Sequence, residues 1–231
     1  MFNAIAEPLG KLLFYIYNMV NSYGLSIVIF TIIVKLVLMP LTLKQSKSMK
    51  DMQELNPKIK ELQKKYGKDK QKLNEKTMEL YKEHKVNPFG GGCLPLLVQL
   101  PILFALFQVL REPQQYVFPP EIYETVEKSF LWIADLSATS SFTESMTDPI
   151  MWVLPLLAAA TTYYQSKMVA PKGGDNPSQS TMTVMMPLMI GYFSFSFPAG
   201  VTLYWVLSNL FQIAQQYFFM GRPGAVKEGS N

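Results

Sequence analysis

Residues 24–43 read GLSIVIFTIIVKLVLMPLTL, an apolar stretch that carries a single charged residue, Lys35. The next segment, residues 44–88, holds 20 charged residues, 13 Lys and 7 Asp or Glu, for a net charge of +6. Bilayer hydrocarbon does not solvate ions, so this separation of apolar from charged segments is typical of membrane proteins. A helix of about 20 residues also matches the thickness of the hydrocarbon core. The sequence therefore predicts a membrane span over residues 24–43.

Four more apolar stretches occur later in the chain. They predict an all-α polytopic membrane protein, in which five transmembrane helices enclose a hydrophilic groove. The predicted parts are an extracytoplasmic interfacial helix at 1–23, transmembrane helices at 24–43, 94–111, 150–168, 181–197 and 201–220, a cytoplasmic helical hairpin at 44–88, an extracytoplasmic loop at 112–149, a cytoplasmic loop at 169–180 and a cytoplasmic tail at 221–231.

Local patterns add detail to three of these parts. Apolar residues recur at helical spacing after Pro8, which predicts an amphipathic helix that begins there and lies in the membrane interface. In 44–88 two such stripes flank Gly67 and predict an antiparallel hairpin, with a break at Asn56-Pro57 in its first arm. The apolar residues of 130–136 predict a short helix that rests on the membrane surface.

The orientation follows from the charges of the loops. Loops rich in Lys and Arg stay in the cytoplasm. The hairpin carries +6, whereas residues 112–149 carry seven Asp or Glu and one Lys, a net charge of −6. With five spans, this places the N-terminus outside and the C-terminus in the cytoplasm. The sequence shows no ordinary signal peptide and no organellar transit peptide, which favours a bacterial plasma membrane.

Lys35 is the residue most informative about function. A lysine at the centre of a span costs roughly 2.5–3.5 kcal/mol on insertion scales. Snorkelling is the alternative, but Lys44 is nine residues away, about 13 Å along a helix, which is too far for one side chain. A water-filled cavity is therefore the favoured interpretation. The predicted lining of this groove comprises Lys35, Thr31, Gln99, Thr161, Gln165, Trp205, Asn209 and Gln212. The alternative for each amide is a simple bond between two helices.

The sequence offers no sign of an enzyme. The predicted spans contain no Asp or Glu, which argues against a proton relay or a cation carrier. Catalytic motifs are absent, and the single cysteine, Cys93, excludes an intramolecular disulfide and a cysteine-based metal site. We expect no cofactor and no metal.

Several stretches together carry a family resemblance. They are Thr31–Lys35 with Met39–Gln45, Leu55–Ile59, Asn87-Pro88 with Gly92–Pro95, Gln99–Ile102, and Phe197–Trp205 with Ser208, Asn209 and Gln212. On these motifs the chain resembles the YidC/Oxa/Albino family of membrane protein insertases over nearly its whole length. The resemblance implies a groove that is open to cytoplasm and lipid but closed outside, faced by a cation at the position of Lys35. Many bacterial members have arginine there, so lysine is a departure.

The resemblance implies a membrane protein insertase and chaperone that acts on nascent membrane proteins. We expect it to function as a monomer in the lipid bilayer, with the Sec translocon, the ribosome and the signal-recognition receptor as candidate further partners. The lysines expected to bind partners on the hairpin are Lys58, Lys64, Lys65 and Lys68. Two alternatives stay open. One is an assembly factor that acts only beside the Sec translocon, and the other is a small-solute channel or transporter.

Overall fold

The computed structural model is all-helical apart from two isolated β-bridges in the residues that it describes. These residues are 3–67, 69–84, 86, 94–139, 148–169 and 177–220. The helices are α1 (Asn3–Val20), α2 (Tyr23–Tyr66), α3 (Lys70–Glu83), α5 (Leu94–Arg111), α6 (Pro113–Tyr116), α7 (Pro120–Tyr123), η1 (Pro149–Trp152), α9 (Val153–Val169), α10 (Pro177–Phe193), η2 (Ser194–Ser196) and α11 (Ala199–Met220).

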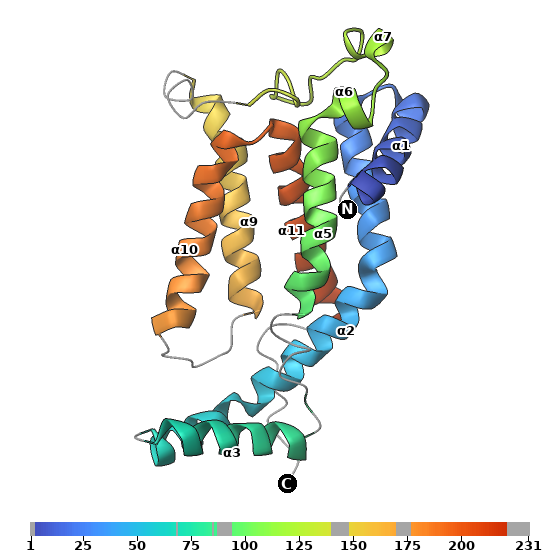
Figure 1. Cartoon of the computed structure of the whole chain (residues 1–231). Coiled ribbons are helices and arrows are strands. Elements are labelled where there is room, and N and C mark those ends of the chain that lie inside the picture. The colour runs from blue at the N-terminus through green and yellow to red at the C-terminus, as the bar shows by residue number, and fades with distance from the viewer. Residues whose placement is uncertain are drawn as a thin grey trace.

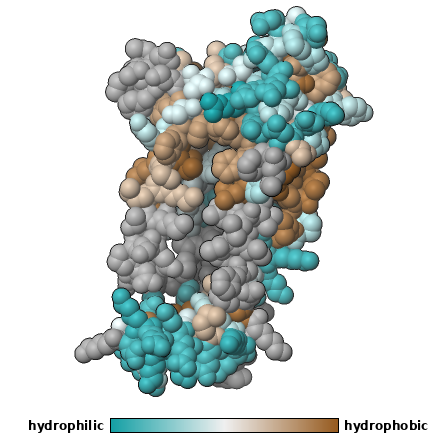
Figure 2. Space-filling view, viewed as in Figure 1, coloured by the Kyte–Doolittle hydropathy of each residue, from teal (hydrophilic) through white to brown (hydrophobic). Residues whose placement is uncertain are grey.

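The upright helical segments in Figure 1 form a bundle. They are α5, α9, α10, α11 and the first half of α2. The second half of α2 turns aside from the bundle and lies against α3, so these two form the hairpin. In the view of Figure 2, hydrophilic residues gather at both ends of the molecule and apolar residues lie between them. This distribution suits a membrane-embedded bundle.

Among the described residues, one helix is both long and apolar enough to cross a bilayer, Tyr23–Tyr66. Two shorter apolar helices are Leu100–Arg111 and Thr183–Ser196. The 22-residue helix α11 is long enough, but its polar side chains lower its mean hydropathy.

Three local predictions are wrong. Helix α1 includes Asn3 and continues through Pro8, because a proline in an early turn gives up only one hydrogen bond. Helix α2 continues through Asn56-Pro57, where Leu55 is buried beside the hairpin and packing offsets the lost bond. Residues 130–133 form a tight turn instead of a helix. The predicted stop at Gly67 is confirmed, since α2 ends at Tyr66.

Residues 113–139 close the end of the bundle at which α2 and α11 begin. The ring of Phe118 packs edge-on against three aromatic rings, those of Phe14, Tyr17 and Tyr23, with centroid distances of 6.2, 4.9 and 5.3 Å. A Cβ atom on Gly10 would overlap the carbonyl oxygen of Tyr116, so α1 and α6 touch backbone to backbone. Residues 113–139, called the cap below, therefore contact the middle and end of α1 and the first turns of α2 and α11.

Candidate functional site

Helices α2 and α11 run parallel and in register. Near the start of both helices, a Cβ on Gly200 would lie 3.2 Å from Cδ1 of Ile27. Further along both helices, Nε2 of Gln215 donates a hydrogen bond of 2.9 Å to the hydroxyl of Thr42. Both pairs are 173 positions apart, and the two helices rise equally per residue. Lys35 therefore lies at the same height as Ser208.

Lys35 is enclosed within the bundle. Its side chain is only 3 % exposed, and it makes no hydrogen bond or salt bridge in the part of the chain that the structure describes. Thr31, one turn earlier, is buried too, and its hydroxyl donates to the Ile27 carbonyl at 2.6 Å. Lys35 does not snorkel to the surface of the protein. It is also more enclosed than an open groove predicts, so the hydration of its surroundings stays a prediction.

A polar node joins α9 to α11. Thr162 is its centre, since its hydroxyl accepts hydrogen bonds from Nε1 of Trp205 at 3.0 Å and from Nδ2 of Asn209 at 2.9 Å. The same amide nitrogen lies 3.2 Å from the hydroxyl of Thr161. These side chains satisfy one another in the bundle interior, where an unpaired polar group is costly.

Further contacts join the same two helices toward their C-terminal ends. Gln165 donates to the side-chain oxygen of Gln212, and Nε2 of Gln216 lies 3.4 Å from the Met168 carbonyl. The partners in these two contacts are 47 and 48 positions apart, so α9 also runs parallel to α11. Both α2 and α9 keep register with α11. Lys35 and the hydrogen-bonded node therefore lie at the same height along the bundle axis.

Comparison with known proteins identifies this bundle. A family model described as "60Kd inner membrane protein" matches residues 15–224. The chain belongs to this family. A relative from Caldanaerobacter subterraneus subsp. tengcongensis is 44 % identical over 96 % of this chain and 97 % of its own length. A second, from Fusobacterium nucleatum, is 43 % identical over 95 % and 97 %. Both are named membrane protein insertase YidC.

The family also has longer members and a solved structure. A YidC insertase from Geobacter sp. is 41 % identical over 94 % of this chain, but this match spans 37 % of that protein. A crystal structure described as an active YidC insertase with its first transmembrane domain resolved superimposes with a TM-score of 0.69 at 29 % identity. It covers 94 % of this chain and 46 % of the solved chain. The resemblance to this family stated from the motifs is confirmed.

The structure brings together most of the predicted groove residues of this family member. Thr161, Gln165, Trp205, Asn209 and Gln212 meet in one node, which is bonded across α9 and α11. Lys35 and Thr31 lie on the α2 side of α11, at the heights of Ser208 and Tyr204. The side chain of Gln99 lies outside the described residues.

Some polar residues of the bundle were absent from the predicted set. Thr162 lies at the centre of the node. Its position next to Thr161 in the sequence could have indicated this role. Thr42 and Gln215 link α2 to α11, and the spacing of 4 and 7 from Thr31 through Lys35 to Thr42 would have revealed the first of them. Ser208 was named only among the motifs of the family resemblance, and its residue type does not mark it as a lining residue, because serine occurs widely in helix contacts within membranes.

Three of the predicted partner-binding lysines, Lys58, Lys64 and Lys65, are exposed on the hairpin. Lys58 lies 2.8 Å from the His84 ring, which ties α2 to the end of α3. Lys64 and Lys65 are exposed, and Lys65 stacks over the Tyr66 ring at 5.5 Å. Lys68 lies outside the described residues. The carboxylate of Glu79, hydrogen-bonded to Lys76, raises the pKa of that lysine, which therefore keeps its charge.

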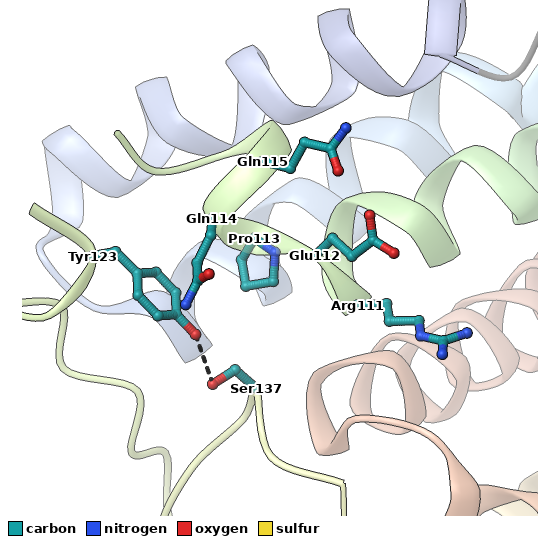
Figure 3. A pocket seen from close by; sticks show the side chains of 7 residues that line it. All are labelled: Arg111, Glu112, Pro113, Gln114, Gln115, Tyr123 and Ser137. Carbon is teal, nitrogen blue, oxygen red and sulfur yellow. Dashed lines mark hydrogen bonds between the residues drawn. The ribbon is translucent and has the colours of Figure 1, made fainter. Parts of the chain in front are cut away.

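A separate pocket of about 350 Å³ lies between the end of α5 and the segment that follows it (Figure 3). Its lining residues are Arg111, Glu112, Pro113, Gln114, Gln115, Tyr123 and Ser137. The hydroxyl of Tyr123 donates to that of Ser137 at 3.2 Å. The described residues contain no group of three His, Cys, Asp or Glu able to hold a metal ion. The pocket belongs to the cap, at a distance from the node.

Proposed function

We propose that this chain is an insertase that moves nascent membrane proteins into the bacterial plasma membrane. Its substrate site is Lys35 together with the polar residues at the same height in the bundle. Two relatives of the same length that carry the insertase name support the function. The observation that carries the site is the enclosed, unpaired ammonium of Lys35 at the height of the α9–α11 node. A cation without a partner in the protein can bind a negatively charged segment of a substrate.

The membrane arrangement is part of the proposal. The first half of α2 with α5, α9, α10 and α11 forms five spans, with α1 outside and the hairpin in the cytoplasm. The acidic loop and the basic hairpin lie at opposite ends of the bundle, which supports this orientation.

In the proposed mechanism, a nascent segment first meets the hairpin lysines. Its short polar flank then enters between the helices, where Lys35 attracts its acidic side chains and the surrounding amides and hydroxyls replace water. Its apolar part leaves sideways into lipid, driven by roughly 25 cal/mol per Å² of apolar surface removed from water. No covalent step, nucleotide or metal takes part. The Sec translocon, the ribosome and the signal-recognition receptor are proposed as docking partners of the hairpin.

The test uses purified protein alone in liposomes, with matched substrates that differ only in the charge of the translocated flank. Lys35→Glu should reduce insertion of the acidic-flank substrate at least several-fold more than that of the neutral one, because repulsion replaces attraction. Equal insertion of both by the variant refutes the role of Lys35.

The same reconstitution separates the alternatives. Insertion without any Sec component argues against an assembly factor that acts only beside the translocon. Flux of a small solute through liposomes that contain no nascent chain favours a channel.

A further inference from the structure

The outer loop presents two apolar side chains at the tip of a tight turn. Phe130 and Ile133 exchange two backbone hydrogen bonds, each of 2.9 Å, so Leu131 and Trp132 occupy the two tip positions. Leu131 is 75 % exposed and Trp132 is 38 % exposed. A tip of this kind usually carries Gly, Asn or Asp, which are polar or have no side chain.

The backbone at the tip is unfavourable for the residue that it carries. Leu131 has φ of 54°, in the left-handed region, where a bulky side chain is strained. A positive φ at the first of the two tip residues is the pattern of a type II′ turn, whose first residue is normally Gly. An exposed leucine adds little to the packing of the fold. A strained residue without a packing role is a reason to look for a function at the tip.

The base of the turn is fixed to two helices of the bundle. The ring of Phe130 lies directly on Gly24, in the first turn of α2. A few residues later, the Leu136 carbonyl accepts a 2.7 Å hydrogen bond from the backbone N–H of Gly200, in the first turn of α11. The turn therefore lies at the level where α2 and α11 begin. Leu25, beside Gly24, is itself 41 % exposed and continues the apolar surface along α2.

We propose that Leu131 and Trp132 insert into the interface of the outer lipid leaflet and anchor the cap there. The proposal rests on the transmembrane placement of α2 in the proposed function, because that placement puts the start of α2 at the outer boundary of the hydrocarbon. Tryptophan prefers this boundary, where its ring is buried and its N–H meets water and headgroups. The lipid is held by apolar burial, since the loop around the tip is acidic and repels anionic headgroups.

The test reads the depth of Trp132 by fluorescence in liposomes of zwitterionic phosphatidylcholine. Trp152→Phe and Trp205→Phe leave Trp132 as the only tryptophan of the chain. We expect quenching by phosphatidylcholine with a doxyl group at carbon 5 to exceed quenching by the carbon-12 form at least twofold, and iodide to quench weakly. A matched control carries all three Trp→Phe changes with Glu121→Trp, an exposed position in α7, and should be quenched by iodide alone.

A second measurement avoids the changes at Trp152 and Trp205. Leu131→Cys in a Cys93→Ser chain is labelled with a polarity-sensitive dye, which should report an apolar setting in liposomes. The control carries Glu121→Cys in the same background, and there the dye should report a polar, water-exposed setting in liposomes without detergent. Leu131→Asn, which suits the left-handed backbone, should keep the fold and lower doxyl quenching of Trp132 at least twofold.

The outcomes distinguish the anchor from the insertase. Strong iodide quenching of Trp132 overturns the anchor, and so does resistance to both iodide and doxyl lipids, which indicates a protein cover. Insertion is measured with the unsubstituted chain, because Trp205 belongs to the node. Either result with normal insertion by that chain leaves the proposed function intact. Absence of insertion by that chain, with an interfacial Trp132 in the variant, refutes the function and leaves the anchor standing.

Discussion

Replacing Lys35 with methionine should stabilise the fold and impair the function. The side chain is 3 % exposed and has no partner among the described residues, so the folded protein holds a charge that nothing nearby neutralises. A lysine at the centre of a membrane helix costs roughly 2.5–3.5 kcal/mol, whereas methionine of similar length costs little. Water or lipid headgroups that reach Lys35 reduce this cost. We therefore expect Lys35→Met to raise the free energy of unfolding by about 1–3 kcal/mol.

The assay is reversible unfolding of the purified protein in bicelles, with Lys44→Met as the matched control. Lys44 is exposed on the same helix, so its replacement should change stability by less than about 0.5 kcal/mol. In parallel, insertion of acidic-flank substrates should fall for Lys35→Met and not for Lys44→Met. A loss of stability in Lys35→Met would show that the ammonium has a stabilising partner, and the reasoning about a free cation would be refuted.

The same position tests for water. In a Cys93→Ser background, Lys35→Cys should react with a small charged thiol reagent, because a hydrated cavity admits the reagent and supports the thiolate. Lack of reaction, together with higher stability in Lys35→Met, would describe a cation in a dry junction. The substrate role proposed for Lys35 could not survive that pair of results.

Two further changes probe the framework around this level. Thr162→Val removes a hydroxyl that accepts two interhelical hydrogen bonds, each worth about 0.6 kcal/mol in membranes, so unfolding should become easier by about 1 kcal/mol. Thr77→Val, whose hydroxyl bonds only its own helix, is the control, and an equal loss in both would contradict the node. Gly10→Ala should cost about 1–3 kcal/mol, because its Cβ would overlap the Tyr116 carbonyl, while Gly191→Ala, with its nearest contact at 3.0 Å, should cost less. Thermal unfolding in bicelles compares the two, and an undisturbed Gly10→Ala would show that the cap is loose.

The helices and the node follow from local sequence patterns. Residues 94–111 were predicted with the bounds of α5, because apolar composition ends abruptly at Arg111. Residues Trp205, Asn209 and Gln212 were placed on one face by their spacing of 4 and 3, and the structure puts all three toward α9. Short-range spacing thus predicts which residues share a face.

Contacts between distant segments explain what the sequence did not predict. The break expected at Pro57 is absent, because α3 packs along α2 and compensates for a missing hydrogen bond. The turn at residues 130–133 depends on Phe130 resting on Gly24, more than 100 positions earlier in the chain. No periodicity in a single segment reports such a contact.

The two faces of α11 suggest different roles for their polar residues. On the face toward α9, Trp205 and Asn209 already form hydrogen bonds within the protein. These side chains must break those bonds before they can bind a substrate. The face toward α2 differs. Ser208 is buried on this face, where Tyr204 of the same helix is the side chain that interacts with its hydroxyl, and Lys35 stands at the same height with no partner in the described residues. An unpaired group gives up nothing when a substrate arrives. We therefore expect the polar flank of a substrate to bind first between α2 and α11, while the node keeps α9 packed against α11.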